Sequence, residues 1–396
     1  MNKKKESKVV PNVRFKGFTD DWKQRKLTEI VNRVNKSSNS DVLPKVEFED
    51  IVSGEGRLNK DISSKFDSRK GTLFEPENIL YGKLRPYLKN WLFSDFEGVA
   101  LGDFWVFEAT DVSVPSFDYY LIQSDDYQKV ANDTSGTKMP RSDWKNVSST
   151  DFAIPSKDEQ KQIGAFFKQL DDTITLYQQK ITLLIKLKKA MLEKMFPKKG
   201  TVIPEFRFNG FANAWEQQKF SELYARSSEK NDGSIGMDKN ITVAIMQFKN
   251  DVKVSTTEYL KTYYTFKLGD IAFEGHQSKE FRYGRFVEND IGNGIVSHIF
   301  AVFRPIQEYD LYFWKYAINN EALMQRILAR STKASTMMHD LVTNDFLNET
   351  FLVPSVKEQK QIGAFLNKLD NLITLHQRKL DMLKKLKSAC LSEMFI

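Results

Sequence analysis

The sequence predicts an α+β protein with a pseudo-two-fold internal repeat, in which two globular α/β domains are separated by an antiparallel pair of long helices that form a coiled coil. Three observations predict this fold. A short head segment occurs at 11–18 and again at 204–211, a tail with helical periodicity occurs at 155–196 and again at 354–395, and the stretches between head and tail contain short β-like runs. Two copies with divergent interiors fit a duplicated domain better than a solenoid, which needs three or more similar units.

Each head contains the motif Arg-Phe-x-Gly-Phe and is followed by a tryptophan, Trp22 in the first copy and Trp215 in the second. The second head begins shortly after Phe196-Pro197 and Gly200, which are residues that end helices. The repeat therefore divides the chain into a first globular domain with the N-terminal head at 1–155, a first spacer helix at 156–196, a second globular domain with the repeated head at 197–354 and a second spacer helix at 355–396.

Each tail is predicted to be one long helix that begins at a capping box. Ser156 with Glu159, and Ser355 with Glu358, have the spacing at which the serine hydroxyl accepts from the third amide while the glutamate accepts from the cap residue's own amide. Apolar residues then recur at alternating steps of four and three, which is typical of a coiled-coil seam. The residues that we assign to the helix pair or to a partner protein are Glu159, Gln160, Ile163, Leu170, Ile174, Leu184, Glu358, Gln359, Ile362, Leu369, Ile373 and Leu383.

Four polar residues interrupt this seam, namely Tyr177, Lys188, His376 and Lys387. Polar residues at single seam positions set the register and the partner choice of coiled coils. We therefore interpret these four as register control rather than as ligands.

The direction of the two helices follows from lengths. A helix of about 40 residues is about 60 Å long, whereas the link from Phe196 to Pro204 stretches only about 25 Å. The second globular domain must therefore begin near the end of the first helix, and a domain roughly 35 Å across is too small to carry the chain back along that helix. We expect the helices to pair antiparallel, with the two domains at opposite ends of the pair.

The two middle stretches diverge in sequence, and both contain runs typical of strands. In the second stretch we expect strands at 242–246, 266–273 and 295–303, with Asn293-Gly294 as a hairpin-type turn. In the first stretch we expect strands at 78–81 and 104–107, and the segments 117–130 and 311–328 have helical character.

The composition is that of a folded protein. The chain has 396 residues, of which 41% are hydrophobic and 28% charged, as in globular domains and unlike disordered chains. Its single cysteine, Cys390, cannot form an internal disulfide, and four histidines with one thiol cannot build a cysteine-rich zinc site. No apolar run approaches the roughly 20 residues that span a bilayer, and the lysine cluster at 1–8 lacks the apolar stretch of a signal peptide. We therefore expect a cytoplasmic protein without a metal site.

The net charge of +7 is unevenly distributed. Residues 157–196 hold eight basic and five acidic side chains and residues 356–396 hold eight basic and four acidic ones, whereas the two middle stretches have no basic excess. Whatever the middle stretches bind, they must bind with local basic patches rather than with an overall charge.

Within the middle stretches, basic residues gather in windows without acids, at 78–94, 134–142, 281–287 and 322–339. Such windows can contact phosphates by charge and base edges by hydrogen bonds, and a solvated face is the alternative for any single residue. The DNA-binding candidates are Lys83, Arg85, Tyr87, Lys89, Thr137, Lys138, Arg141, Gln277, Lys279, Arg282, Arg285, His298, Lys333 and His339.

No residue pattern of a catalytic centre is recognised in this chain. Asp151 with Glu159-Gln160-Lys161 superficially matches half of a metal-dependent nuclease motif, but Glu159 falls in the capping box and Thr350 stands at the position of the aspartate in the second copy. Gly292-Asn-Gly294 is not followed by the helix start that a phosphate-binding loop requires. Because methyltransferase, P-loop and nucleophile-elbow motifs are also not found, we predict a recognition protein that catalyses no reaction itself.

The duplicated layout resembles the DNA-specificity (S) subunit of type I restriction-modification systems, over nearly the whole chain. The motifs that carry the resemblance are Pro-x3-Glu-Gln-x2-Ile after each middle stretch, beginning at Pro155 and Pro354, the head Arg-Phe-x-Gly-Phe, the segment Lys83-Leu-Arg-Pro-Tyr87 and the segment Gly294-Ile-Val-Ser-His298. Their order, repeated in two copies, makes the resemblance specific.

The resemblance implies a non-catalytic subunit with two target recognition domains, each reading one half of a split, asymmetric site in double-stranded DNA, while the helix pair fixes the spacer. It implies two methyltransferase (modification) subunits that bind S-adenosylmethionine and restriction endonuclease subunits that use ATP and magnesium as partners, so that this chain itself would bind no cofactor. Two alternatives stay open: a stand-alone pseudo-dimeric DNA-binding regulator, which would bind without a methyltransferase, and a single-chain nuclease, which would cleave DNA with a metal.

Overall fold

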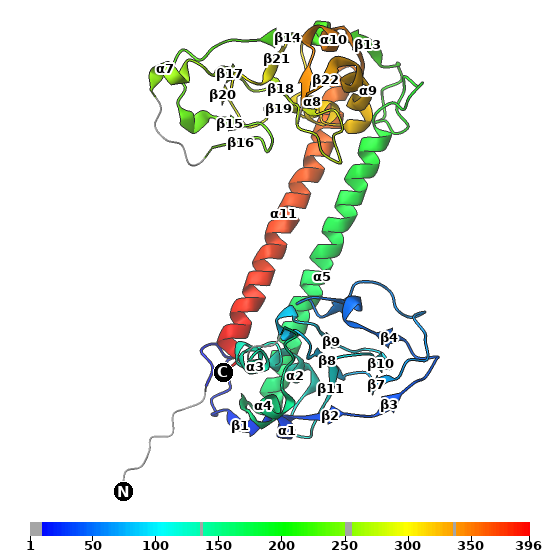
Figure 1. Cartoon of the computed structure of the whole chain (residues 1–396), viewed down its shortest axis with the longest axis vertical. Coiled ribbons are helices and arrows are strands. Elements are labelled where there is room, and N and C mark those ends of the chain that lie inside the picture. Colours follow the sequence, from blue (N-terminus) through cyan, green and yellow to red (C-terminus); the bar gives the residue numbers. More distant parts are fainter. Residues whose placement is uncertain (1–9, 135–137, 250–255, 336–337) are drawn as a thin grey trace. The chain divides into compact units, whose positions relative to one another are not determined.

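The structure is a computed structural model that describes residues 10–134, 138–249, 256–335 and 338–396 (Figure 1). The chain folds into two compact units, the first made of residues 1–179 and 377–396 and the second of residues 180–376. Each unit combines helices with sheets, so the predicted α+β class is confirmed. Two long helices, α5 (Lys157–Lys194) and α11 (Val356–Met394), each contribute one part to each unit.

The first unit is built on two four-stranded sheets. Its strands are β1 (Lys23–Lys26), β2 (Val31–Val34), β3 (Ser37–Ser38), β4 (Lys45–Val46), β5 (Ile51–Val52), β6 (Arg57–Leu58), β7 (Gly71–Phe74), β8 (Ile79–Gly82), β9 (Trp91–Phe93), β10 (Gly98–Ala100), β11 (Phe104–Ala109) and β12 (Asp151–Ile154), and its short helices are α1 (Leu27–Ile30), α2 (Pro115–Leu121), α3 (Asp125–Ala131) and α4 (Trp144–Ser149). One sheet has the order β2-β11-β8-β9 and is antiparallel; the other has the order β3-β7-β10-β4, with β10 and β4 parallel. A separate pair, β1-β12, joins the head to the strand that precedes α5.

The second unit repeats one four-stranded sheet and the head pair of the first, and has the two-stranded pair of β17 (Tyr264–Phe266) and β20 (Gly294–Val296) instead of a second four-stranded sheet. Its strands are β13 (Glu216–Lys219), β14 (Tyr224–Ser227), β15 (Ile241–Thr242), β16 (Gln247–Phe248), β17 (Tyr264–Phe266), β18 (Ile271–Glu274), β19 (Arg285–Glu288), β20 (Gly294–Val296), β21 (Ala301–Pro305), β22 (Thr332–Ala334), β23 (His339–Leu341) and β24 (Thr350–Val353), and its short helices are α6 (Phe220–Leu223), α7 (Thr257–Leu260), α8 (Leu311–Ile318), α9 (Glu321–Ser331) and α10 (Thr343–Asn348). The sheet β14-β21-β18-β19 corresponds to β2-β11-β8-β9, and the pair β13-β24 corresponds to β1-β12. The middle stretches therefore share an architecture that their sequences do not reveal.

In the main sheets of the two units, β2-β11-β8-β9 and β14-β21-β18-β19, the inner strands β8 and β18 each lie between two apolar cores. Side chains alternate between the faces of a strand, so Ile79 and Tyr81 of β8 join the core beneath α2 and α3 while Leu80 joins a second core with Phe104 and Val106. All four residues of β8 are buried, which explains why the strand reads as an uninterrupted apolar run. The strand β18 is used in the same way in the second unit.

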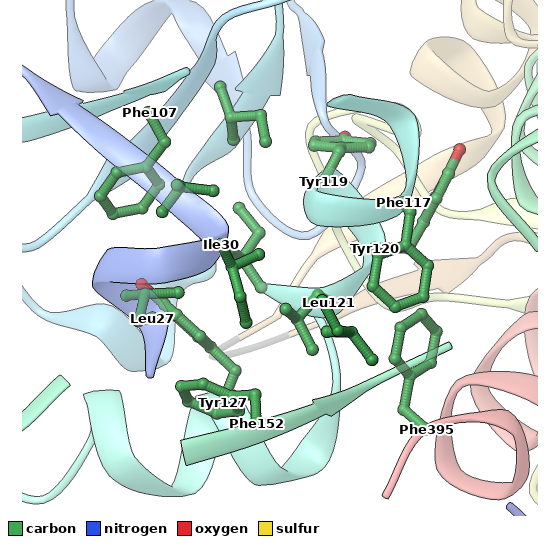
Figure 2. Packing of buried hydrophobic residues seen from close by; sticks show 14 of the residues in the cluster. Leu27, Ile30, Phe107, Phe117, Tyr119, Tyr120, Leu121, Tyr127, Phe152 and Phe395 are labelled. Atoms are coloured by element: carbon green, nitrogen blue, oxygen red, sulfur yellow. The ribbon is translucent and has the colours of Figure 1, made fainter. Parts of the chain in front are cut away.

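The end of α11 completes the core of the first unit. Figure 2 shows the ring of Phe395 beside Phe117 and Tyr120 of α2. The rings of Phe117 and Phe395 stack with centroids 5.4 Å apart, and Met394 is buried in the same cluster. The second unit uses Met195 and Phe196, which follow α5, in the same way, and Phe196 stacks on Phe313 at 5.6 Å.

Each head is fastened to the start of a long helix by a buried ion pair. Arg14 donates from Nε to Glu159 Oε1 at 2.6 Å and from Nη2 to Oε2 at 2.8 Å, and Arg207 holds Glu358 at 2.7 and 2.8 Å. Both carboxylates are buried. The predicted capping boxes are therefore wrong in one part, because the glutamates are taken up by the head arginines rather than by the cap amides; the Ser355 hydroxyl does lie 3.4 Å from the Glu358 amide.

Within each unit the two long helices run antiparallel, as predicted. In the first unit Phe167 of α5 contacts Phe395, and Asp171, further along α5, pairs with Lys387, which comes earlier in the chain. In the second unit Lys188 of α5 pairs with Asp370 of α11 at 2.6 Å. Residue numbers on α11 therefore fall as those on α5 rise.

The structure corrects three predicted strands of the second middle stretch. The run 242–246 is a strand only up to Thr242, because Met246 has φ +46° and closes a turn into β16. The run 266–273 is two strands, β17 and β18, separated by a turn in which the Asp270 amide donates to the Lys267 carbonyl at 2.9 Å. The run 295–303 is likewise two strands, β20 and β21, separated by a turn at 297–300.

Three other local predictions are also corrected. The segment Asn293-Gly294 is no hairpin, because the flanking strands β19 and β20 pair with different partners, β18 and β17. The segment 117–130 forms two helices, since Ser124 caps α3 and accepts from the Tyr127 amide. In the same way Asn320 caps α9 and divides the segment 311–328.

Candidate nucleic-acid interface

In the first unit, two of the basic windows lie side by side. The segment that leaves β8 is hydrogen bonded to the segment between α3 and α4: the Ser142 amide donates to the Lys83 carbonyl at 2.8 Å, and the Arg85 amide donates to the Pro140 carbonyl at 2.7 Å. The candidates Lys83, Arg85 and Arg141 therefore share one surface, although they are far apart in the sequence. Lys138 is exposed in the second of these segments, and Thr137 lies outside the described residues.

The cations of this surface differ in their partners. Lys83 and Arg141 flank one carboxylate, with Nζ and Nη2 at 3.7 and 3.0 Å from Asp103. The hydrogen bond to Asp103 raises the pKa of Arg141. Arg85 and Lys89 are exposed, and no ion pair of theirs is found in the described part of the chain. Arg85 and Lys89 are thus available to phosphates, whereas Lys83 and Arg141 must share their charge with Asp103.

In the second unit, the segment that leaves β18 lies beside the hairpin β22-β23. The His339 amide donates to the Gly275 carbonyl at 2.8 Å, and His276 forms an isolated bridge with Met338. A Cβ on Gly275 would lie 2.0 Å from the His339 carbonyl oxygen, so only glycine permits this approach. The two basic windows of the second unit therefore come together at the same place in the topology as those of the first unit.

Two candidates of the second unit are engaged in the fold. Arg285 pairs with Glu274 at 2.7 Å, donates to the Ala244 carbonyl at 2.6 Å and covers the ring of Phe281. His339 is buried, and its ring meets that of Tyr283 at 5.4 Å. These contacts fit a positioning role for Arg285 and His339 better than a direct contact with DNA.

The remaining candidates of the second unit are exposed. Gln277, Lys279 and Arg282 lie on the segment between β18 and β19, and Lys333 lies on β22. His298 is also exposed, but it lies on the turn between β20 and β21 rather than on the paired segments. From the sequence, His276 was considered as a residue that could contact DNA, whereas Met338, which pairs with it, was missed. Gly275 and Gly284 at the two ends of the loop are the signal that could have identified this pairing.

Each unit ties a short helix to both long helices through tyrosine, aspartate and lysine. In the first unit the Tyr120 hydroxyl donates to Asp171 at 3.0 Å, Lys387 pairs with Asp171 at 2.7 Å, and the Lys387 ammonium lies 5.4 Å from the Tyr120 ring centre. Burial and the nearby Asp171 carboxylate raise the pKa of Tyr120. This arrangement fits the predicted role of Lys387 in setting the register.

The second unit repeats this contact with different residues of the repeat. Tyr316 donates to Asp370 at 2.6 Å, and Lys188 pairs with Asp370 at 2.6 Å while lying 5.1 Å from the Tyr316 ring centre. Burial and the hydrogen bond to Asp370 raise the pKa of Tyr316. The two lysines that interrupt the predicted seam therefore serve equivalent contacts in the two units.

The residues predicted for the helix pair are mostly buried. The buried apolar ones are Ile163, Leu170, Ile174, Ile362, Leu369 and Leu383, and the half-buried ones are Leu184 and Ile373. Gln160 and Gln359 are buried as well, and their amide groups donate to the Pro155 and Pro354 carbonyls at 2.9 and 3.1 Å. Glu159, Gln160, Glu358 and Gln359 thus fasten the helix starts to the adjoining globular part.

The family model described as the type I restriction modification DNA specificity domain matches the chain twice, at residues 19–186 and 193–385. The chain belongs to this family. The two matches follow the internal repeat: each covers one middle stretch and most of one long helix, and the second also covers the repeated head at 204–211. The resemblance inferred from the duplicated motifs is thereby confirmed.

Two specificity subunits are similar in sequence. The chain is 23% identical over 270 residues to the type I restriction enzyme MjaVIII specificity subunit of Methanocaldococcus jannaschii, which covers 64% of this chain and 63% of that protein. It is 27% identical over 190 residues to the type I restriction enzyme HindI specificity subunit of Haemophilus influenzae, covering 44% of this chain and 41% of that protein. The chain thus spans less than two thirds of the length of either relative.

Solved structures share the fold. The type I restriction-modification S subunit from M. genitalium superposes with a TM-score of 0.62 at 13% identity, covering 98% of this chain and 99% of that chain. A chain from a structural study of complex assembly and conformational transition of the type I R-M system has a TM-score of 0.51 at 17% identity, covering 93% and 96%. These likenesses confirm the fold class of the specificity family for this chain.

None of the described helices is both long and apolar enough to cross a membrane. No group of three or more histidine, cysteine, aspartate or glutamate side chains in the described ranges is placed to hold a metal ion.

Proposed function

We propose that each unit of this specificity subunit reads one half of a bipartite, asymmetric site in double-stranded DNA. The observation that carries the proposal is the pair of surfaces formed after β8 and after β18. Both surfaces occupy the same place in the topology and present exposed cations, which supports contact with phosphates. Two related readers on one chain suit the two-fold symmetry of duplex DNA.

The two surfaces differ in chemistry, which supports two different half-sites. The first presents exposed cations at Arg85 and Lys89 with apolar residues between them. The second presents Gln277, Lys279 and Arg282, whose amide and cationic groups can hydrogen bond to base edges in the major groove. An asymmetric site is therefore favoured over a palindrome.

Exposed apolar side chains on the long helices support the recruitment of partner subunits. In the first unit they are Leu176 of α5 and Met382 and Leu386 of α11. In the second they are Leu375 of α11 and Leu183, Ile185 and Leu187 of α5, and all seven are between 40% and 64% exposed. Contiguous exposed apolar residues mark interaction sites. Since each unit carries one such set, we propose that the chain recruits two copies of one modification subunit, and restriction subunits in addition.

We further propose that the reactions take place in these partners, with S-adenosylmethionine, ATP and magnesium bound there and no cofactor bound by this chain. The position of Glu159, the carboxylate of the nuclease-like motif, argues against a nuclease. Both oxygens of Glu159 accept hydrogen bonds from Arg14 inside the fold, and Glu159 is therefore not free to ligate a metal. The bulky side chain of Lys161 is exposed and pairs with Asp158 at 3.5 Å.

The first test is methylome sequencing of a host with and without the gene, which should reveal one bipartite methylated motif that disappears with the gene. The second test is binding of the assembled complex to DNA altered in one half at a time. Reversal of charge at Lys83 and Arg85 should weaken recognition of one half-site and leave assembly intact. Unchanged affinity for both halves would exclude Lys83 and Arg85, and specific binding by the chain alone, without any modification subunit, would favour a regulator instead.

A further inference from the structure

The turn that follows β8 presents two apolar side chains to solvent between two cations. Tyr87 is 57% and Leu88 37% exposed, and Arg85 and Lys89 on either side of them are exposed as well. Pro86, the first residue of this 3₁₀ turn, is buried and anchors it. An exposed apolar pair of this kind has no role in the core of the unit.

The turn is held in a conformation that ordinary side chains adopt rarely. Arg85 has φ +48° and Lys89 has φ +55°, and they are two of the four non-glycine residues with positive φ in the described ranges. Such a conformation is unfavourable for a residue with a Cβ, because the Cβ comes too close to the following carbonyl oxygen. Left-handed residues held by their surroundings in this way are concentrated at functional sites.

Three hydrogen bonds to two other segments hold the turn. The Arg85 amide donates to the Pro140 carbonyl at 2.7 Å, the Gly54 amide donates to the Lys89 carbonyl at 2.9 Å, and the Ser53 hydroxyl donates to the Leu88 carbonyl. The tip is therefore preorganised, and little conformational entropy is lost when it meets a ligand.

The side chains of the tip are not used within the fold. No hydrogen bond, ion pair or ring contact is found for the side chains of Arg85, Tyr87 and Lys89 among the residues that the structure describes. Lys83 and Arg141 beside them share Asp103. The corresponding loop of the second unit differs, because its aromatic residue Phe281 is half-buried under Arg285.

We propose that Tyr87 and Leu88 form an apolar wedge that inserts at a base step of the half-site read by the first unit, while Arg85 and Lys89 bind the phosphates on either side. This inference rests on the proposed function and adds the mode of reading. Apolar side chains that enter a base step unstack it and kink the duplex. Because pyrimidine–purine steps unstack most readily, the first half-site is read partly through deformability, at a step where no base edge is contacted.

The wedge is tested with 2-aminopurine, whose fluorescence rises on unstacking, placed in turn at each position of the half-site and bound by the assembled complex. The wild-type complex should show a rise at one step other than that of the methylated base. The double variant Tyr87→Ala/Leu88→Ala should lose that rise and about 10- to 100-fold in affinity, as for loss of a base-stacking aromatic residue. Any extrusion of the methylated base by a modification subunit should persist in the variant, because it does not depend on the wedge.

Three further variants separate wedge from charge and from folding. Tyr87→Phe should keep the fluorescence rise, since only the ring is needed. Phe66→Ala removes an aromatic side chain of the same unit that is 50% exposed, and should change neither fluorescence nor affinity. Arg85→Gln/Lys89→Gln should keep the rise but lower the slope of log affinity against log salt by about 1.8, for two lost phosphate contacts.

The inference is overturned if the wild-type complex shows no rise outside the methylated base, or if Tyr87→Ala/Leu88→Ala keeps the rise. Failure of the proposed function would look different, since the wild-type complex would then fail to discriminate DNA altered in either half. The two failures are therefore measured independently.

Discussion

Removal of the arginine from one head is expected to release that head from its long helix. In the first unit the Glu159 side chain is fully buried and that of Arg14 is 14% exposed, with two hydrogen bonds of 2.6 and 2.8 Å between them. Arg14→Ala leaves the buried carboxylate without its cation, and breaking a buried ion pair in this way costs about 3–5 kcal/mol. Because water reaches part of Arg14, we expect about 3 kcal/mol, which is about a 100-fold rise in local opening.

Peptide-level hydrogen exchange measures this opening without requiring that the whole chain unfold in one step. Exchange should rise in β1 and in the first turns of α5. Arg207→Ala is the matched variant in the second unit, where it should raise exchange in β13 and in the first turns of α11. The double variant Arg14→Met/Glu159→Met should exchange more slowly than Arg14→Ala, because it leaves no uncompensated charge. A rise of less than about 5-fold in Arg14→Ala, which corresponds to about 1 kcal/mol, would refute the reasoning.

Three other predictions follow from the long helices and from a buried carboxylate. Changing the length of α5 and α11 together should alter the preferred spacer and neither half-site, as selection from a random-spacer library would show. An unchanged spacer would contradict the expectation, implied by the resemblance, that the helix pair fixes the spacer. Replacing Asp171 by Asn and Lys387 by Gln, singly and together, should give a coupling free energy of about 1 kcal/mol in denaturation experiments. If the losses in the free energy of unfolding of the two single variants simply add in the double variant, the two side chains do not interact and the interpretation is wrong. Burial, with Asp290 nearby, raises the pKa of Glu288 well above its usual value, so the folded chain keeps this proton to a higher pH than the unfolded chain. The second unit therefore loses stability as the pH rises above the unfolded-state pKa of about 4.3, and Glu288→Gln should raise its melting temperature more at about pH 8 than at about pH 5; equal gains would contradict this sign.

The structure of the head and tail of each repeat was predictable because the chain contains two copies of each, and the two copies can be compared with one another. The steps of four and three from Ile163 and from Ile362 indicate two helices, and chain lengths alone require that they run antiparallel. The partner of Glu159 was not predictable, because Arg14 lies far away in the sequence and a capping box accounts equally well for a glutamate three residues after Ser156.

The middle stretches were harder to predict because their strands are short. A strand of two residues, such as β15, has no periodicity, and the apolar run 295–303 conceals the turn at 297–300. The equivalence of β8 and β18 appears only in the pairing of strands. A buried strand needs apolar residues, but many different apolar residues meet that need, so the two sequences can differ. Here the main sheet is repeated while its residues are not.

For the candidate surface, the sequence predicted which segments take part but not which individual side chains are available to a ligand. Charge clustering identified the segments around Arg85 and Arg282, which the fold joins to their neighbours. The neutralising partners, Asp103 for Arg141 and Glu274 for Arg285, come from outside those windows. Tertiary pairing therefore decides which cations stay available.

The burial of Phe395 beside Trp22 and Phe117 has a consequence for biosynthesis. The ribosome makes the strands of the first unit early, but the residues that seal its core are translated only after every residue of the second unit. During synthesis, the first unit therefore exposes part of its apolar core until the C-terminal segment has been made. A chain that ends before Met394 would lack this part of the core, and the loss would destabilise the unit that is synthesised first.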